Sequence, residues 1–400
     1  MSNKRRPKIL VFSDYYLPGY KSGGGMRTIV NMVERLSHKY HFYVVTRDHD
    51  GVQDREPYTT VEIDSWNDIG QARVFYLSRH NIGATTIKKL VEEVSPDVLY
   101  TNSCFSTLAI YLLKLRRLRV IEDRPVVIAP CGELSVGALE LKKSKKQIFL
   151  NWAKLIRLYR NVIWKASTKL EADEVLRMNP KEPTIMVAPD LPSDKIFPEY
   201  SFESKPNKAP GRVKIVFVSR FHKKKNFNWV IPILTRLNGE VLVDIIGPIQ
   251  DWDYFQETEH LISELPENIQ VSAVGPVPHE SVCRTMSDYH FFICPTLGEN
   301  FGHIFLEAMA AGCPLLISDR TPWLNLQEKG IGWDIPLEEP EAWESALQEC
   351  VDMDSEGFAE LSKKSRAFVT DWLSSPELDS ETESVLDHAV EVSRRNAAVA

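Results

Sequence analysis

The sequence FFICPTLGENFGHIFLEAMAAGCP spans residues 291–314 and combines a strand, a turn and a helix in one short stretch. Its first four residues form an apolar strand, and a turn begins at Pro295. A helix is expected from about Gly302 to a Gly-Cys-Pro stop at residues 312–314. A strand, a tight turn and a helix N-terminus in this order favour a phosphate group, because unpaired N–H groups and the helix dipole attract an anion.

Two carboxylates, Glu299 and Glu307, stand on either side of the helix start. Glu299 lies in the loop before the helix, and Glu307 lies about one and a half turns inside it, at about 1.5 Å of rise per residue. Carboxylates repel a phosphate, so they need another role, such as accepting hydrogen bonds from sugar hydroxyls. The stretch therefore indicates a pocket for a nucleotide sugar.

Apolar strands alternate with helices in both halves of the chain, which is typical of open parallel sheets. Strands are expected at residues 8–13, 41–46, 74–77, 97–101 and 126–129, and again at 214–219, 241–246, 269–273, 291–294 and 315–318. A five-proline segment at 189–210 separates the two series and is typical of a linker. We expect an α/β protein with two Rossmann-like domains and a cleft between them. The expected limits are 1–190 and 191–370, followed by a helical tail at 371–400.

The composition is that of a soluble globular protein, with 43% hydrophobic and 26% charged residues among 400. No window holds 18 uninterrupted apolar residues, so no membrane-spanning helix is expected. The N-terminus leads from a basic pentamer into a strand without a secretory signal, which favours the cytoplasm. The six cysteines are scattered and include no CxxC pair, so neither disulfides nor a zinc site is expected.

Charge is distributed unevenly along the chain. Residues 1–190 hold 30 Lys and Arg against 21 Asp and Glu, whereas residues 191–400 hold 18 against 34. This asymmetry indicates an anionic partner for the first half. Nucleic acid is not expected, because the chain is acidic overall and carries no recognised nucleic-acid motif.

Basic and aromatic residues alternate at helical spacing in residues 139–164. The basic edge includes Lys142, Lys143, Lys145 and Lys146, and the other face is broad and apolar. Two interpretations remain open. The helix either packs on the core with its charged side solvated, or rests on the anionic lipid headgroups of the inner membrane face.

Polar residues gather where the expected strands end, which is where open parallel sheets bind ligands. The loop at residues 14–25 ends in three glycines, including Gly24 and Gly25, but does not have the GxGxxG spacing. It is either a flexible surface turn or a loop that lets the backbone approach a ligand. The candidates that follow other strands of the first half are Asn102, Cys131, Gly132 and Glu133.

A basic loop, RFHKKKN, follows the strand at 214–219 and runs from Arg220 to residue 226. Arg offers a forked donor and Lys a point charge, so the loop could receive a diphosphate. The alternative is a solvated turn. His222 in this loop and His303 near the helix start lack the partners of a hydrolase triad, and packed, capping or solvated roles are expected for them.

Three Asp-x-Asp triplets could suggest a metal site. They are Asp48-His49-Asp50, Asp251-Trp252-Asp253 and Asp352-Met353-Asp354. None of them adjoins the basic loop, so we expect solvated turns. Neither a metal nor another cofactor is expected, apart from a nucleotide-diphosphate sugar as co-substrate.

These motifs resemble those of a known family. SRFHKKKN is similar to the Arg…Lys loop, and ENFGHIFLE to the E-x7-E motif, of retaining family-4 glycosyltransferases with the GT-B fold. GPVPHESV, APCGELSVGALELKKSKK and TPWLNLQEKGIGW also have counterparts there. The resemblance covers most of residues 8–350. It implies transfer of a sugar from a nucleotide diphosphate to a glycan or lipid-linked acceptor, with retention of configuration, in polysaccharide or glycoconjugate biosynthesis.

The resemblance also implies residue roles. Arg220 and Lys225 would hold the donor diphosphate and stabilise the leaving group, and Glu299 would contact the donor sugar. Glu307 would bind the ribose. The remaining donor-side residues that it implies are Val277 at the base, the backbone of Asn300, Phe301 and Gly302, and the phosphate-facing Gly24 and Gly25. Residues 1–190 would form the acceptor side and residues 191–370 the nucleotide-sugar side.

The chain departs from the family pattern on the acceptor side. Many relatives have a His at the strand end where this sequence reads Pro130-Cys131-Gly132. The family's usual Asn-Gly turn near the domain junction is replaced by residues 188–190, Ala-Pro-Asp. A non-catalytic nucleotide-sugar-binding or scaffold subunit therefore stays open as an alternative, and so do an epimerase and an inverting transferase of the same fold.

Overall fold

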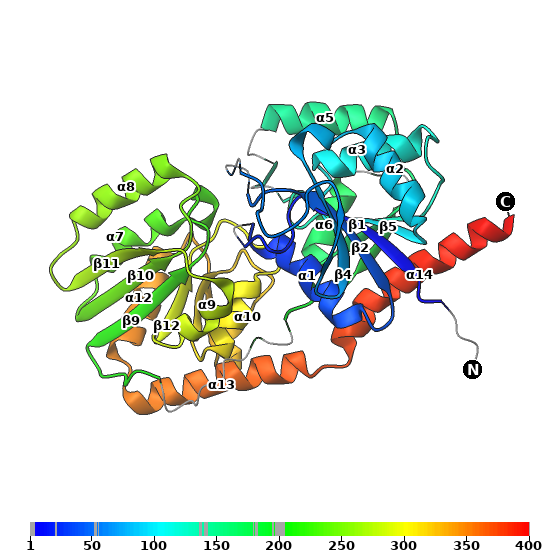
Figure 1. Cartoon of the computed structure of the whole chain (residues 1–400). Coiled ribbons are helices and arrows are strands. Elements are labelled where there is room, and N and C mark those ends of the chain that lie inside the picture. Colours follow the sequence, from blue (N-terminus) through cyan, green and yellow to red (C-terminus); the bar gives the residue numbers. More distant parts are fainter. Residues whose placement is uncertain are drawn as a thin grey trace. The chain divides into compact units, whose positions relative to one another are not determined.

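The computed structural model describes residues 5–20, 22–51, 54, 56–135, 138–139, 143–178, 180, 183–193, 196 and 205–399, apart from the side chains of Lys143 and Val399. The chain divides into two units (Figure 1). The first unit contains Met1–Leu191 and Pro376–Ala400, and the second contains Pro192–Ser375. Each has its own mainly parallel sheet with helices, so the expected α/β fold with two such domains is confirmed. The cleft stays a prediction.

The described part of the first unit contains an eight-stranded sheet of order β3-β4-β2-β1-β5-β6-β7-β8. Its strands are β1 (Lys8–Phe12), β2 (His41–Arg47), β3 (Trp66–Ile69), β4 (Ala72–Leu77), β5 (Val98–Thr101), β6 (Val126–Ile128), β7 (Val162–Ala166) and β8 (Thr184–Val187). Its helices are α1 (Gly24–Leu36), η1 (Arg79–Asn81), α2 (Ala84–Val94), α3 (Thr107–Arg117), α5 (Lys143–Leu155), α6 (Lys169–Arg177) and α14 (Glu377–Val399).

β1 pairs with both β2 and β5, and all the strand pairs of this sheet are parallel except β3 with β4. The connections therefore change direction at β1, and ligands of such sheets bind at the carboxyl ends beside this switch point. The loop after β1 is the glycine loop (residues 14–25). The sequence of this unit thus brings the glycine loop next to the residues that follow β5.

The last long helix, α14, belongs to the first unit. It contacts α1, β5 and β6, and it runs along this unit in Figure 1. Lys39 pairs with Glu383 and Asp387 of α14 at 2.6 and 2.8 Å, and the hydroxyl of Tyr40 donates to Asp387 at 2.7 Å. The helical segment expected at 371–400 therefore contains a helix that covers part of the first sheet.

The described part of the second unit contains a six-stranded parallel sheet of order β11-β10-β9-β12-β13-β14. Its strands are β9 (Arg212–Val218), β10 (Glu240–Ile246), β11 (Ile269–Gly275), β12 (Phe291–Cys294), β13 (Leu315–Ser318) and β14 (Gly332–Ile335). Its helices are η3 (Lys223–Lys225), η4 (Phe227–Trp229), α7 (Ile231–Leu234), α8 (Trp252–Ser263), α9 (His279–Met286), α10 (His303–Ala310), α11 (Leu326–Lys329), α12 (Pro340–Asp352) and α13 (Ser355–Leu373).

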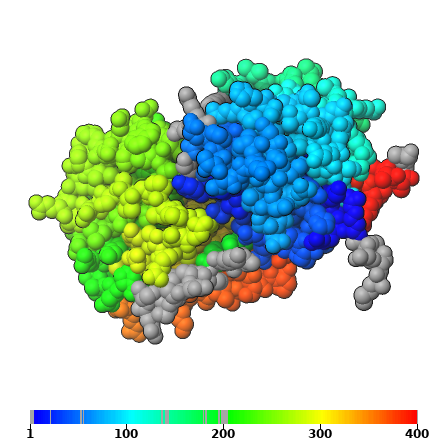
Figure 2. Space-filling view, in the orientation of Figure 1, coloured from blue at the N-terminus to red at the C-terminus, as the bar shows by residue number. Residues whose placement is uncertain are grey.

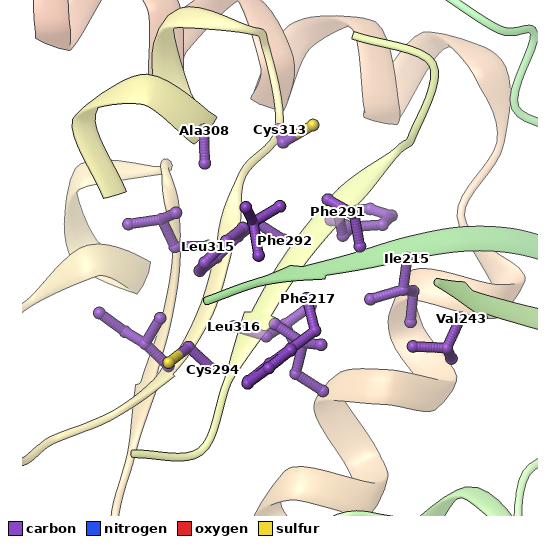
Figure 3. Close-up of a cluster of buried hydrophobic side chains, with 14 of the residues drawn as sticks. Ile215, Phe217, Val243, Phe291, Phe292, Cys294, Ala308, Cys313, Leu315 and Leu316 are labelled. Carbon is purple, nitrogen blue, oxygen red and sulfur yellow. The ribbon is translucent and has the colours of Figure 1, made fainter. Parts of the chain in front are cut away.

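The core of the second unit forms around β9 and β12, which are paired. Figure 3 shows Phe217 of β9 beside Leu316 of β13, with Phe291 and Phe292 of β12 between strands and helices. The four residues of β12 are all fully buried, as expected for a central strand of a parallel sheet. This buried pair of strands fixes the position of the two loops that leave their carboxyl ends.

Two expected helices are wrong. Residues 139–164 were expected to form one helix, but α5 ends at Leu155 and residues 162–166 form the buried strand β7. Arg157 and Asn161, which separate the two, both adopt positive φ angles, at 53° and 52°, and so break the helix. The alternation of strands and helices also predicts a helix at residues 228–237, but the structure has η4 and the single-turn α7 there, and Pro232 in α7 lacks a backbone donor.

The Asp-x-Asp triplets also differ from expectation. Asp48, His49 and Asp50 were expected in a solvated turn, yet their exposed fractions are only 7%, 5% and 6%. The glycine loop covers them, which residue patterns alone do not indicate. The other two triplets flank helix starts: Asp251 accepts the backbone N–H of Tyr254 at 3.2 Å, and Asp354 accepts that of Gly357 at 2.8 Å.

The basic helix is only partly as expected. α5 lies at the surface of the first unit (Figure 2), and it exposes Ile148 and Leu155 by 69% and 81%. Lys145 is exposed, whereas Lys146 donates to the carbonyl of Ala138 at 2.6 Å. Lys142 lies outside the described residues, as does the side chain of Lys143. None of the helices described has both the length and the apolarity needed to cross a membrane.

Candidate active site

In the second unit, β9 and β12 mark the point where the strand order reverses, because β9 pairs with β10 on one side and with β12 on the other. The basic loop leaves β9 and the Glu299 loop (residues 295–302) leaves β12. The two loops are joined through the carbonyl of Lys224. It accepts the backbone N–H of Leu297 at 2.9 Å and the hydroxyl of Thr296 at 3.2 Å.

Lys225 and Glu299 meet at this junction, where the Lys225 Nζ donates to the Glu299 carboxylate. Their side chains are only 15% and 19% exposed. Burial opposes both charges, but the Glu299 charge beside it raises the pKa of Lys225 above the ordinary value. Burial likewise raises the pKa of Glu299, yet the charges of Lys225 and Lys224 outweigh it and hold that pKa below the ordinary value. Both groups therefore stay charged near neutral pH.

The basic loop is shaped locally so that its lysines differ. His222 accepts the backbone N–H of Lys224 at its Nδ1, 3.1 Å away, which caps the short helix η3. Asn226 then ends η3 in the left-handed region at φ 59°. As a result Lys225 is largely buried, whereas Lys223 is exposed and has no ion pair among the described residues.

Arg220 lies at the edge of this arrangement. It is exposed, and its Nη1 approaches Gln250 Oε1 at 3.4 Å. Its charge helps to lower the pKa of Glu299, although the nearer lysines contribute more. The structure thus brings Lys225 and Glu299 into direct contact and leaves Arg220 on the solvent side of the pair.

Gly302 is the N-cap of α10, the helix that follows the Glu299 loop, and its φ is 82°. A Cβ there would lie 2.5 Å from the Phe305 ring, so only glycine fits. Phe301 packs its side chain edge-on to His303 and Trp323, with ring centroids 4.9 and 5.8 Å apart. Its side chain is therefore core, and its carbonyl accepts the Trp323 Nε1–H, so only its backbone N–H remains for a ligand. Asn300 is half-buried beside it.

Glu307 lies in α10, and a histidine that the sequence analysis did not single out accompanies it. His279 Nε2 is 3.9 Å from Glu307 Oε1. His279 is the first residue of α9 and follows Val277, which is half-buried. A basic residue shortly after the expected base-binding loop was the available sequence signal for this neighbour.

In the first unit, a hydrogen-bonded chain joins three of the predicted residues at the switch point. The Cys131 thiol donates to Asn102 Oδ1 at 3.0 Å, and Asn102 Nδ2 donates to the carbonyl of Gly25 at 2.6 Å. Cys131 adopts φ 52°, which is uncommon for a residue with a side chain. Gly24 and Gly25 are the first residues of α1, so this chain fixes the start of that helix.

The other predicted acceptor-side groups hold the fold together. Glu133 accepts the hydroxyl of Ser103 at 2.7 Å and the backbone N–H of Cys104 at 2.8 Å. The backbone N–H of Gly132 donates to Glu171 Oε1 at 2.7 Å. Both carboxylates are occupied by the protein itself.

One buried ion pair was missed by sequence reasoning. Lys165 Nζ lies 2.8 Å from Asp190 Oδ1, and these side chains are 2% and 6% exposed. The Thr28 hydroxyl of α1 donates to the other oxygen of Asp190 at 3.1 Å. Burial lowers and the Asp190 charge raises the pKa of Lys165, and the net shift is upward. A lysine within the apolar run VIWKA was the only signal in the sequence.

No group of three or more His, Cys, Asp and Glu side chains suited to a metal ion occurs in the part of the chain that the structure describes. The six cysteines, all of them described, are free thiols.

Residues 200–367 match the family model described as Glycosyl transferases group 1. This segment contains Arg220, Lys225, Glu299 and Glu307. No curated protein matches the chain.

Solved structures resemble the whole chain. HepE of Anabaena, bound to UDP and glucose, is 14% identical with a TM-score of 0.69, covering 96% of this chain and 100% of its own. WaaG, a glycosyltransferase involved in lipopolysaccharide biosynthesis, is 13% identical with a TM-score of 0.63 over 94% and 98%. The catalytic domain of starch synthase IV from Arabidopsis thaliana, bound to ADP and acarbose, is 11% identical with a TM-score of 0.67 over 97% and 100%. At such identities the likeness shows the fold. Residues 200–367 of the second unit therefore match the glycosyl transferases of group 1, and the whole chain has the GT-B fold.

Proposed function

We propose that this glycosyltransferase moves a sugar from a nucleotide diphosphate to a glycan or lipid-linked acceptor, with retention, in cell-surface polysaccharide or glycoconjugate biosynthesis. The observation that carries the proposal is the Lys225–Glu299 pair at the switch point of the second unit. A cation there meets the diphosphate, and the carboxylate beside it meets the sugar.

Breaking the bond between the sugar and the diphosphate leaves an electron pair on a phosphate oxygen and positive character on the sugar ring. Lys225, Arg220 and the N-terminus of α10 stabilise the leaving oxygen, because preorganised cations and N–H groups act strongly in a site shielded from water. Glu299 hydrogen-bonds the donor sugar, and Glu307 binds the ribose hydroxyls. The hydroxyl of the acceptor attacks from the same face and gives its proton to the leaving phosphate oxygen.

We expect the wild-type chain to release a nucleotide diphosphate from at least one sugar nucleotide. HepE was solved with UDP and starch synthase IV with ADP, so UDP- and ADP-linked glucose, galactose and N-acetylglucosamine form the first panel. Addition of EDTA should change the rate by less than about twofold, because cations of the protein already neutralise the diphosphate. The measurement is coupled nucleotide release with and without EDTA. Release that stops in EDTA and returns with Mg²⁺ would refute the metal-independent part.

The alternative of a binding or scaffold subunit makes a different prediction. Calorimetry should then detect binding of a nucleotide diphosphate to the second unit, whereas no donor of the panel should release one. The non-histidine strand end at Cys131 is the observation that favours it. Turnover of one donor excludes it.

We also propose reversible attachment of the first unit to anionic membranes through α5. Lys145, Ile148 and Leu155 recur at spacings of three and seven residues and so share one helix face. This face offers one cation beside two exposed apolar side chains, which suits an anionic lipid interface.

Charge reversal at Lys142, Lys143 and Lys145, combined with Ile148→Ser and Leu155→Ser, should at least halve the fraction that floats with phosphatidylglycerol vesicles. Neutral phosphatidylcholine vesicles should retain little of the wild-type protein. Lys88→Glu on α2 is the matched control, because the side chain of Lys88 is 44% exposed but lies on another helix. Equal flotation of the multiple variant and the wild-type protein would leave α5 as an ordinary solvated helix.

A further inference from the structure

The buried triplet Asp48-His49-Asp50 has no part in the donor chemistry described above, although it lies directly after β2 at the carboxyl edge of the first sheet. His49 Nδ1 is 2.7 Å from Asp48 Oδ1. A carboxylate on Nδ1 holds the proton there, so Nε2 of the neutral ring presents its lone pair. Nε2 has no hydrogen-bond partner among the described residues.

The glycine loop is fastened to this triplet. Asp50 accepts the backbone N–H of Tyr20 at 2.7 Å and the hydroxyl of Ser22 at 3.3 Å. A Cβ on Gly19 would lie 2.8 Å from Asp50 Oδ1, so a side chain there would collide with the carboxylate. The triplet and the glycine loop are therefore held together by hydrogen bonds and close packing, unlike a solvated turn.

The neighbours of His49 are polar and titratable. The Tyr15 ring stands edge-on to the imidazole, with centroids 6.3 Å apart. Asp14, at the end of β1, pairs with Arg47 at 3.2 Å. Burial raises the pKa of Asp14 although Arg47 opposes the shift. The hydroxyl of Tyr58 is buried without a hydrogen-bond partner. Perturbed groups that gather at strand ends are typical of ligand sites.

The location of the candidate donor site indicates which ligand these groups bind. The family match covers residues 200–367, in the second unit, and that unit carries the Lys225–Glu299 pair. The second substrate then needs a site in the first unit, where the carboxyl ends of the strands are the expected location. A sugar offers hydroxyl donors, and the lone pair of Nε2 is an acceptor of matching chemistry.

We propose that His49, oriented by Asp48, binds a hydroxyl group of the carbohydrate acceptor through Nε2. The proposal rests on the proposed glycosyltransferase function, since it assigns part of the acceptor site. Asp48 is then a positioning residue that acts through the imidazole, whereas His49 touches the substrate.

A direct test is NMR of protein labelled with ¹⁵N-histidine, in which His49→Gln identifies the His49 signals. Methyl α-glucoside, methyl α-galactoside, N-acetylglucosamine and lactose serve as probes, added after UDP. The Nε2 resonance of His49 should shift in a saturable manner with at least one probe. The signals of His80, which is exposed on η1, should not move. No shift of His49 with any of the four probes overturns the proposal.

Two substitutions separate binding from structural support. Asparagine places its amide near the position of Nδ1, so His49→Asn can keep the Asp48 contact but loses Nε2. Glutamine reaches the position of Nε2, so His49→Gln can still accept a hydroxyl. With the donor that the panel identifies and the best carbohydrate probe, His49→Asn should lower acceptor kcat/KM about tenfold, the value of one hydrogen bond. His49→Gln should recover part of the loss, and Asp48→Asn should fall between them.

Donor affinity and the rate of donor hydrolysis by water should stay within twofold in all three variants. His80→Gln is the control for a generic histidine loss. If His49→Asn is the more active of the two His49 variants, the residue serves the Asp48 contact alone and the proposal fails. If wild-type protein hydrolyses no donor, the proposed function fails instead, while the NMR titration still reports on sugar binding.

Discussion

The Lys225→Met variant is expected to lose about 10²–10³ in kcat for nucleotide release, which corresponds to about 3–4 kcal/mol of transition-state stabilisation. Lys225 is the cation that the structure holds rigidly, by burial and by the Glu299 carboxylate, at the end of β9. A neutral side chain of similar length keeps the packing but leaves the developing phosphate charge without its nearest cation. The measurement is single-turnover release from the donor that the panel identifies.

Lys223→Met is the matched control, because Lys223 lies in the same short helix η3 but is exposed without an ion pair among the described residues. It should reduce kcat by less than about threefold, as screened surface charges act weakly. A second variant, Glu299→Gln, removes the charge of the Lys225 partner but keeps its shape. Its kcat should be lower than that of the wild-type protein by about tenfold or more. Equal kcat in Lys225→Met and Lys223→Met would remove Lys225 from the mechanism.

The pH range of this pair follows from the directions of the two shifts. The folded pKa of Glu299 lies below the ordinary glutamate pKa of 4.5. The stabilisation from its charge is therefore complete above pH 4.5 and is lost as pH falls through the lower folded pKa. The folded pKa of Lys225 lies above the ordinary lysine pKa of 10.5. The stabilisation from its charge is therefore complete below pH 10.5 and is lost as pH rises through the higher folded pKa. Neither group should limit activity between about pH 5 and 10.

Asp190→Ala is expected to lower the free energy of unfolding by about 3–5 kcal/mol, because it leaves the Lys165 ammonium buried without its counter-ion. The same change removes the acceptor of the Thr28 hydroxyl, so α1 loses a hydrogen bond that anchors it just beyond the glycine loop. Urea denaturation at pH 7 measures the loss. The raised pKa of Lys165 means that its stabilisation is complete below pH 10.5 and is lost only above it.

The double variant Lys165→Met with Asp190→Leu tests the origin of the loss. Replacing both partners removes the stranded charge, and the double variant should regain at least half of the stability that Asp190→Ala loses. Lys364→Ala, which breaks an exposed pair with Glu360 one helical turn away, should cost less than about 0.5 kcal/mol. A double variant no more stable than Asp190→Ala would contradict the assignment to an uncompensated charge.

Local patterns were sufficient to predict that Lys225 and Glu299 lie at the same edge of the second sheet, whereas their role in donor binding stays a prediction. Lys225 and Glu299 each follow a continuous apolar strand, and parallel strands end at the same edge of a sheet. Their direct contact depends on which strands are neighbours, and β9 beside β12 is a topological fact that no local pattern contains. The same basic-loop pattern also predicted Arg220, which lies at the exposed edge of the Lys225–Glu299 pair.

The first unit was harder to predict because its polar contacts join distant segments. Lys165 and Asp190 are 25 residues apart, and their burial depends on the packing of α1. Asp48 and His49 look like a solvated turn until the glycine loop closes over them. β7 was hidden because Ile163 and Trp164 satisfy a helical period as well as a strand, and only the left-handed residues before them separate the two.

The path of the chain has a consequence for how the protein is made. The first unit needs α14, yet about 180 residues of the second unit are synthesised between Leu191 and that helix. At about 5–20 residues per second, the ribosome takes roughly 10–40 s to produce them. During this interval the surface that α14 will cover, which includes Tyr40 and parts of β5 and β6, remains uncovered on the nascent chain. The second unit can therefore fold first, and the half that begins synthesis is the half that finishes folding last.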